Sequence, residues 1–99
     1  MLTRTLLKSK KNICKVMFEL PATVNAQMAC VVGEFNDWDV RATPMKRKRD
    51  GSFSIALNLA TEREYRFRYL LDEERWENEP HADKHVANDF GSEDSVLAL

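Results

Sequence analysis

The sequence predicts an all-β protein folded as an antiparallel β-sandwich. Three observations lead to this prediction. About six or seven short segments alternate apolar and polar residues, turn-forming residues separate them, and no segment sustains the 3.6-residue period of a helix. The chain of 99 residues, 43% of them hydrophobic and 31% charged, has the size and composition of a single folded domain.

The predicted strands are, in chain order, residues 14–20, 27–33, 45–49, 52–59, 64–72 and 95–99. Alternation lets each strand bury one face. Asp50-Gly51 is the clearest turn signal, because this dipeptide readily takes the positive φ angles of a tight hairpin. In the strand 64–72, the alternation places Arg66 and Arg68 on the outer face.

The remaining segments show no clear period. Residues 1–12 are expected to form a flexible basic arm, or else a short amphipathic turn, ahead of a single domain at residues 13–99. Residues 81–89 are expected to form a loop. The N-terminus lacks the apolar core of a secretory signal, and no apolar stretch is long enough to span a bilayer, so we expect a cytoplasmic protein. Cys14 and Cys30 fall in predicted strands, where buried free thiols are favoured over a disulfide.

Two tryptophans carry the main functional signal. Trp38 ends a polar run, and Trp76 follows the polar turn 72–75, so neither lies in an apolar segment. Exposed aromatic rings mark binding surfaces, and sugar rings stack on them through their apolar C–H faces. Arg68 lies on the strand that leads into the Trp76 turn, where its guanidinium can donate several hydrogen bonds to sugar hydroxyls. The alternatives are two structural tryptophans at the sandwich edge and a solvated arginine without a ligand.

Other patterns argue against nucleic-acid and metal binding. The basic run at residues 46–49 lies on a strand, so its charges point to opposite faces, and the formal net charge of the chain is −1. His81, Asp83 and His85 lack a fourth ligand, and a polar loop is the simpler interpretation. We therefore expect neither a metal site, nor a nucleic-acid partner, nor a membrane partner.

Catalysis is not expected either. The carboxylates at positions 73, 74, 77 and 79 cluster on a turn predicted to be exposed, where nothing would raise a pKa for acid catalysis. The sequence has no glycine-rich phosphate loop and no nucleophile elbow. We predict a protein that is not an enzyme and uses no cofactor.

A set of short motifs resembles a known family. The motifs are residues 31–38 (VVGEFNDW), 44–45 (PM), 50–53 (DGSF), 65–69 (YRFRY), 76–80 (WENEP) and 88–91 (NDFG). In order and spacing they are similar to the isoamylase N-terminal, early-set domain, which is carbohydrate-binding module family 48. This family includes the glycogen-binding domain of the AMP-activated protein kinase β subunit. The resemblance implies an immunoglobulin-like β-sandwich that binds α-1,4-linked glucans such as glycogen, starch and maltooligosaccharides.

The resemblance also implies a binding site. Trp38 and Trp76 match the two stacking tryptophans of the glycogen-binding form, and Arg68 stands where that form has a hydrogen-bonding lysine. The turn before Trp76 is one residue longer than in the kinase domain, which can shift this ring.

Three further positions follow on the loop side. Phe90 stands where a leucine inserts into the helical glucan, and Ser92 replaces a threonine. Asp94 stands where an asparagine contacts sugar hydroxyls, so it can accept hydrogen bonds but lacks the amide donor.

The family leaves an alternative function open. Some of its members bind no glucan and serve as structural domains fused to glycosyl hydrolases or branching enzymes. The alternative is therefore a protein-interaction or structural module of the same fold. In either case we expect a free-standing module or a small subunit, with a glycogen-metabolising enzyme or another protein as its partner in trans.

Overall fold

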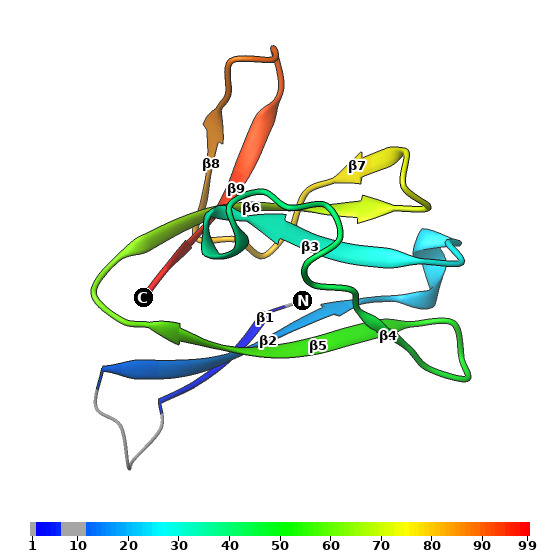
Figure 1. Cartoon of the computed structure of the whole chain (residues 1–99), viewed down its shortest axis with the longest axis horizontal. Coiled ribbons are helices and arrows are strands. Elements are labelled where there is room, and N and C mark those ends of the chain that lie inside the picture. The colour runs from blue at the N-terminus through cyan, green and yellow to red at the C-terminus, as the bar shows by residue number, and fades with distance from the viewer. Residues whose placement is uncertain (1, 7–11) are drawn as a thin grey trace.

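The computed structural model, which describes residues 2–6 and 12–99, consists of two antiparallel sheets packed face to face (Figure 1). The elements are β1 (Leu2–Leu6), β2 (Ile13–Leu20), the 3-10 turn η1 (Ala22–Val24), β3 (Ala29–Gly33), the 3-10 turn η2 (Glu34–Asn36), β4 (Lys46–Arg47), β5 (Phe53–Ala60), β6 (Glu64–Leu71), β7 (Arg75–Glu77), β8 (Lys84–Ala87) and β9 (Glu93–Ala98). The first sheet has the order β1-β2-β5-β4, and the second has the order β3-β6-β9-β8 with β7 also paired to β6. The predicted all-β sandwich is confirmed.

The core lies between the two sheets and is built by the period-two alternation. Its largest fully buried hydrophobic side chains are Phe18, Phe53, Phe67, Tyr69, Leu71 and Leu97. The rings of Phe18 and Phe67, from opposite sheets, meet edge to face with their centroids 5.3 Å apart. This contact between β2 and β6 joins the two layers at the centre of the sandwich.

The predicted hairpin at Asp50-Gly51 is confirmed. Gly51 has a φ of +89°, and the Lys48 N–H donates to the Ser52 carbonyl over 2.8 Å. The hairpin joins β4 to β5, and both residues of β4 are exposed. Short, charged edge strands of this kind resist pairing with other chains.

Strand β6 organises the second sheet around the site. It pairs with β3 along residues 67–71 on one edge, and with β9 along residues 64–67 and β7 along residues 69–71 on the other. The outward side chains of β6 therefore lie between a segment that continues from β3 and segments that belong to β7 and β9.

The structure differs from the prediction at the N-terminus. Instead of a loose arm, Leu2–Leu6 form β1, which pairs antiparallel with β2 from Leu2↔Phe18 to Leu6↔Cys14. Residue 1 and residues 7–11 of the predicted arm lie outside the described residues. The N–H and C=O groups along the edge of β2 provide hydrogen-bonding partners that a local sequence pattern does not reveal. The first sheet thus begins ahead of the predicted domain boundary at residue 13.

Two short strands also differ from the prediction. β8 forms inside the predicted loop 81–89, and β7 forms where no strand was predicted. Most side chains of both strands are exposed, so the apolar alternation that reveals a half-buried strand is missing. In Figure 1 the β8–β9 hairpin projects beyond the second sheet, on the side away from the first.

Two smaller features complete the fold. Cys14 on β2 and Cys30 on β3 are free thiols, the first buried and the second half-buried. None of the helical turns in residues 2–6 and 12–99 has the length and apolar character needed to cross a membrane.

Candidate functional site

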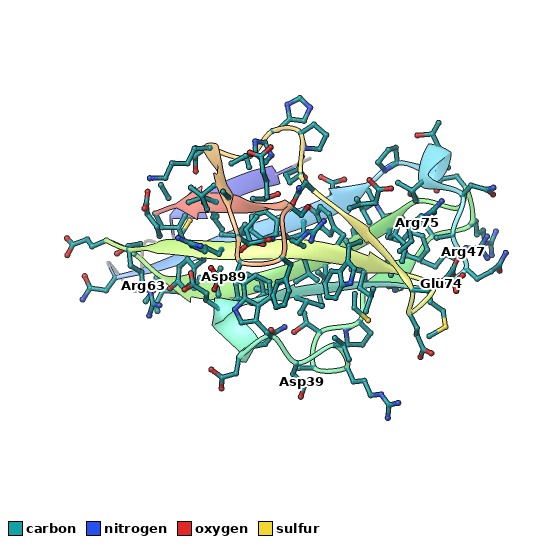
Figure 2. The ribbon with its side chains drawn as sticks, turned by 90° about the horizontal axis from the view of Figure 1, so that it is seen from above. Asp39, Arg47, Arg63, Glu74, Arg75 and Asp89 are labelled. Atoms are coloured by element: carbon teal, nitrogen blue, oxygen red, sulfur yellow. The ribbon has the colours of Figure 1, made fainter. Side chains whose placement is uncertain are left out.

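A groove of about 800 Å³ opens on the outer face of the second sheet. Its walls come from η2 and the loop after it, from β6 and β7, and from β9 and the β8–β9 loop. The lining residues are Glu34, Trp38, Val40, Arg66, Arg68, Trp76, Asn88, Asp89, Phe90 and Asp94. Figure 2 shows Asp89 on the β8–β9 loop and Asp39 on the loop that follows Trp38. The structure thus brings five of the six predicted site residues together, from four separate parts of the chain.

Trp38 is held at the groove by a tight turn after β3. Asp37 and Trp38 both take left-handed φ angles, of 56° and 59°, and the Trp38 N–H donates to the Gly33 carbonyl over 2.8 Å. The side chain of Asn36 fixes this turn, because its Oδ1 accepts the Gly33 N–H and its Nδ2 donates to the Thr43 hydroxyl over 2.9 Å. The indole remains 38% exposed. Positive φ angles at residues other than glycine cost conformational free energy, and here they hold the Trp38 ring toward solvent.

Trp76 lies across the groove from Trp38. On β7 it pairs with Leu70 of β6, which places its ring on the same outward face as Arg68. The guanidinium carbon of Arg68 lies 5.6 Å from the centroid of the Trp76 ring, within the range of a cation–π contact. Trp76 is 41% exposed, so part of its ring is free for a ligand.

Arg68 occupies the middle of the groove floor. It pairs with Val32 of β3 on one side, while β7 lies along the other edge of β6. The segment after β3 carries Trp38 and β7 carries Trp76, so Arg68 lies between the two tryptophans. Its Nε is buried and has no hydrogen-bond partner among the described residues. Because this N–H is buried, a bound hydroxyl can accept a hydrogen bond from it only after the side chain shifts.

The long turn before Trp76 is well fixed. Asp72 and Glu73 have φ angles of 53° and 62°, so two successive left-handed residues accommodate its length. The Asp72 carboxylate accepts the N–H groups of Gln27 and Met28 over 2.8 and 3.0 Å. These bonds tie the turn to the segment that leads into β3, and hence to the side of the groove that carries Trp38.

The loop side of the groove combines an exposed ring with a buried carboxylate. Phe90 is 93% exposed at the tip of the β8–β9 loop, whereas Asp94 is 6% exposed. Asp94 Oδ1 accepts the Asn88 side-chain amide over 3.1 Å, and its Oδ2 lies 4.0 Å from Arg66 Nη1. Ser92 lines a second hollow of about 580 Å³ on the same loop instead of the groove itself. Asp94 thus already has protein partners, and Ser92 lies on the same loop as Phe90 but outside the groove lining.

Five lining residues were not predicted as site residues: Glu34, Val40, Arg66, Asn88 and Asp89. Arg66 shares the outward face of Arg68, so the alternation already contained the signal for it. The backbone N–H of Arg66 donates to Glu34 Oε1 over 2.6 Å, which anchors η2 to β6. Glu34 and Asn88 belong to the motifs at residues 31–38 and 88–91, but only the strand pairing in the structure shows that they line the groove.

The prediction for Glu79 is wrong, because this residue is fully buried instead of lying on an exposed turn. Its carboxylate accepts hydrogen bonds from the Tyr69 hydroxyl over 2.8 Å and from the His81 N–H over 2.9 Å. Burial alone would raise the pKa of Glu79, but the hydrogen bonds outweigh it and lower the pKa below its ordinary value. Burial also raises the pKa of Tyr69, so that this side chain remains a neutral donor. Glu79 does not line the groove.

The segment 81–85 carries the potential metal ligands His81, Asp83 and His85. His85 Nε2 lies 2.9 Å from the Glu79 carbonyl oxygen, so one of its ring nitrogens has a backbone partner. The part of the chain that the structure describes contains no group of three or more His, Cys, Asp or Glu side chains arranged to hold a metal ion.

A small β-sandwich that presents aromatic rings in an open groove has the form of a binding module. The isoamylase N-terminal domain family, carbohydrate-binding module 48, matches residues 10–86, and the chain belongs to this family. The resemblance found in the sequence is thereby confirmed. Over 48 residues the chain is 44% identical to the 1,4-alpha-glucan branching enzyme GlgB of Novosphingobium aromaticivorans. The aligned region is 46% of this chain and 7% of that enzyme, so the chain spans only a small part of this relative's length.

Proposed function

We propose that this chain is a non-catalytic module that binds α-1,4-linked glucans, such as glycogen, starch and maltooligosaccharides, in the groove on its second sheet. The observation that carries the proposal is that Trp38 and Trp76, each about two-fifths exposed, line one groove with Arg68 between them. The family and the 1,4-alpha-glucan named for the related branching enzyme support this class of ligand.

Each part of the groove suits one feature of a glucan. The free faces of Trp38 and Trp76 stack against the apolar C–H faces of two glucose units. The guanidinium of Arg68, whose buried Nε–H has no partner among the described residues, shifts toward the ligand and donates to a hydroxyl between them. Phe90 contacts the ligand from the β8–β9 loop, and the Asp94 carboxylate contributes a polar contact on that side. Ser92 contacts a ligand that extends past the loop into the second hollow.

The groove is open, and this sets the expected strength of binding. Stacking and a few hydrogen bonds must offset the lost freedom of a flexible oligosaccharide. We expect dissociation constants on the order of micromolar to millimolar for short maltooligosaccharides. Several such modules on a branched polysaccharide would bind more tightly through avidity.

The test is a titration with maltoheptaose, followed by tryptophan fluorescence, beside a titration with cellohexaose. The second sugar has the same glucose units in β-1,4 linkage, which makes it extended instead of curved. We expect a saturable change with maltoheptaose and a much weaker one with cellohexaose. No response to maltoheptaose at about 10 mM, well above the expected range, would refute the proposal. A partner recovered equally with and without added glycogen would then favour the protein-interaction alternative.

A further inference from the structure

Asn88 begins the NDFG motif at residues 88–91 but was not predicted as a site residue. It follows directly after β8 and lines both the groove and the second hollow. It is thus shared by the two depressions that flank the β8–β9 loop, residues 88–92. The ring at the tip of this loop, Phe90, is 93% exposed, so side-chain packing contributes little to its position. Whatever orders the loop must act mainly through its backbone.

The side chain of Asn88 provides that order. Its Oδ1 accepts the N–H of Phe90 over 2.9 Å and the N–H of Ser92 over 3.2 Å. Its own backbone N–H donates to the Ser92 carbonyl over 3.0 Å, which closes the hairpin. Gly91 has a φ of +77°, and a Cβ there would meet nothing within 4 Å, so glycine serves the turn geometry alone. One amide oxygen therefore fixes the backbone on both sides of the tip.

The same side chain connects the loop to the floor of the groove. Asn88 Nδ2 donates to Asp94 Oδ1 over 3.1 Å, and Asp94 is 6% exposed on β9. The other oxygen of Asp94 lies 4.0 Å from Arg66 on β6. The tip thus connects through one side chain to a buried carboxylate and from there to the central strand.

We propose that Asn88 is a positioning residue, which holds Phe90 and Ser92 in the geometry that a glucan contacts without itself having to bind the sugar. The inference rests on the proposed function. A loop already ordered in the free protein loses less conformational entropy when ligand arrives, and this raises affinity without any new contact.

The experiment compares Asn88→Ala and Asn88→Asp with the wild-type chain. Alanine removes both the acceptor and the donor. Aspartate keeps the acceptor for the loop, but it loses the donor to Asp94 and places a second carboxylate beside it, which the Asp94 carboxylate repels. Asn58→Ala is the matched control, since Asn58 is exposed on β5 in the other sheet. Three quantities are measured: the Kd for maltoheptaose by calorimetry, the exchange rates of the Phe90 and Ser92 amides by NMR, and the melting temperature.

We expect Asn88→Ala to raise the Kd by about fivefold to tenfold, an effect of the size of one lost hydrogen bond. The Phe90 and Ser92 amides should exchange at least about tenfold faster. The melting temperature should stay within about 4 °C of wild type, because the loop lies outside the core. Asn88→Asp should protect both amides better than Asn88→Ala does and lose less affinity, and Asn58→Ala should change none of the three.

Two results would overturn the inference while leaving glucan binding intact. One is that the wild-type chain binds maltoheptaose and Asn88→Ala binds it with the same Kd. The other is loop amides that exchange at the same rate in both proteins. A wild-type chain that binds no maltoheptaose refutes the proposed function and this inference with it. If Asn88→Ala does not fold, Asn88→Asp is compared with wild type instead. The inference is supported if the Kd rises in step with the exchange rates of the Phe90 and Ser92 amides, and it is overturned if the two change independently.

Discussion

Replacing Trp76 by alanine removes one of the two rings on which the proposed stacking depends. Trp76 is 41% exposed, and with about 250 Å² for a tryptophan this leaves roughly 100 Å² in contact with solvent. A sugar ring covers one face, about half of that area. At about 25 cal/mol per Å² of apolar surface, the stacking contributes roughly 1.2 kcal/mol, which is about sevenfold in Kd.

Trp38 gives nearly the same expectation, because it is 38% exposed. If the two rings act independently, the double variant Trp38→Ala, Trp76→Ala should lose about fiftyfold in affinity. The loss from Trp76→Ala should be the larger of the two single effects. That ring is also the cation–π partner of Arg68, and its removal frees the guanidinium to move.

Calorimetric titration with maltoheptaose measures these effects, since fluorescence changes when an indole is removed. Met28→Ala is the matched control: Met28 is 53% exposed but does not line the groove, so its truncation should leave the Kd unchanged. The reasoning is refuted if either tryptophan variant binds within twofold of wild type, or if Met28→Ala loses as much as they do.

Three further predictions concern charge, space and pH. Arg68→Met should weaken maltoheptaose binding by about fivefold, because it removes one hydrogen bond to the sugar and the cation–π contact with Trp76. The control Arg63→Met removes a similar cation–π contact outside the groove and should leave the Kd unchanged. Gly33→Ala should lower the melting temperature by roughly 5–15 °C, because its Cβ would lie 2.5 Å from a backbone oxygen of β6. Gly91→Ala, in open space but at a φ of +77°, should cost only about 1–2 kcal/mol. The folded-state pKa of Glu79 lies below its ordinary value of 4.5. The contribution of Glu79 to the free energy of unfolding should therefore be complete above pH 4.5 and be lost as the pH falls through the folded-state pKa. Urea unfolding at several pH values should show a weaker dependence of stability on acid pH in Glu79→Gln than in wild type.

Each of these predictions has a contradicting result. An Arg68→Met variant with wild-type affinity would show that the guanidinium does not contribute to glucan binding. Equal melting temperatures for Gly33→Ala and wild type would show that β3 and β6 can separate freely at that point. An unchanged acid slope in Glu79→Gln would assign the pH dependence of stability to other carboxylates.

Most of the sandwich could be predicted because its strands bury one face. In β6, Tyr65, Phe67 and Tyr69 point into the core and alternate with Arg66 and Arg68, so the sequence itself distinguishes inside from outside. The same alternation placed Arg68 on the face that forms the groove floor. The turn at Asp50-Gly51 was equally predictable, since its geometry depends on local residues alone.

The rest depends on contacts between distant segments. β1 and β8 add to free sheet edges through backbone hydrogen bonds, which leave no apolar pattern in their sequences. Glu79 resembles its exposed neighbours in sequence, and only the tertiary contact with Tyr69 shows that it is buried. Asn36 and Asn88 resemble ordinary turn residues, and their hydrogen bonds to the loops that carry Trp38 and Phe90 become visible only in three dimensions.

The most direct measurement is an NMR titration of the labelled chain with maltoheptaose that follows both indole N–H signals, the Arg68 Nε–H and the backbone amides. The account predicts that these three side-chain signals and the amides of residues 88–92 shift together, with one dissociation constant, while the amides of β2 and β5 stay in place. Shifts confined to the first sheet, or a response from only one of the two indoles, would contradict it.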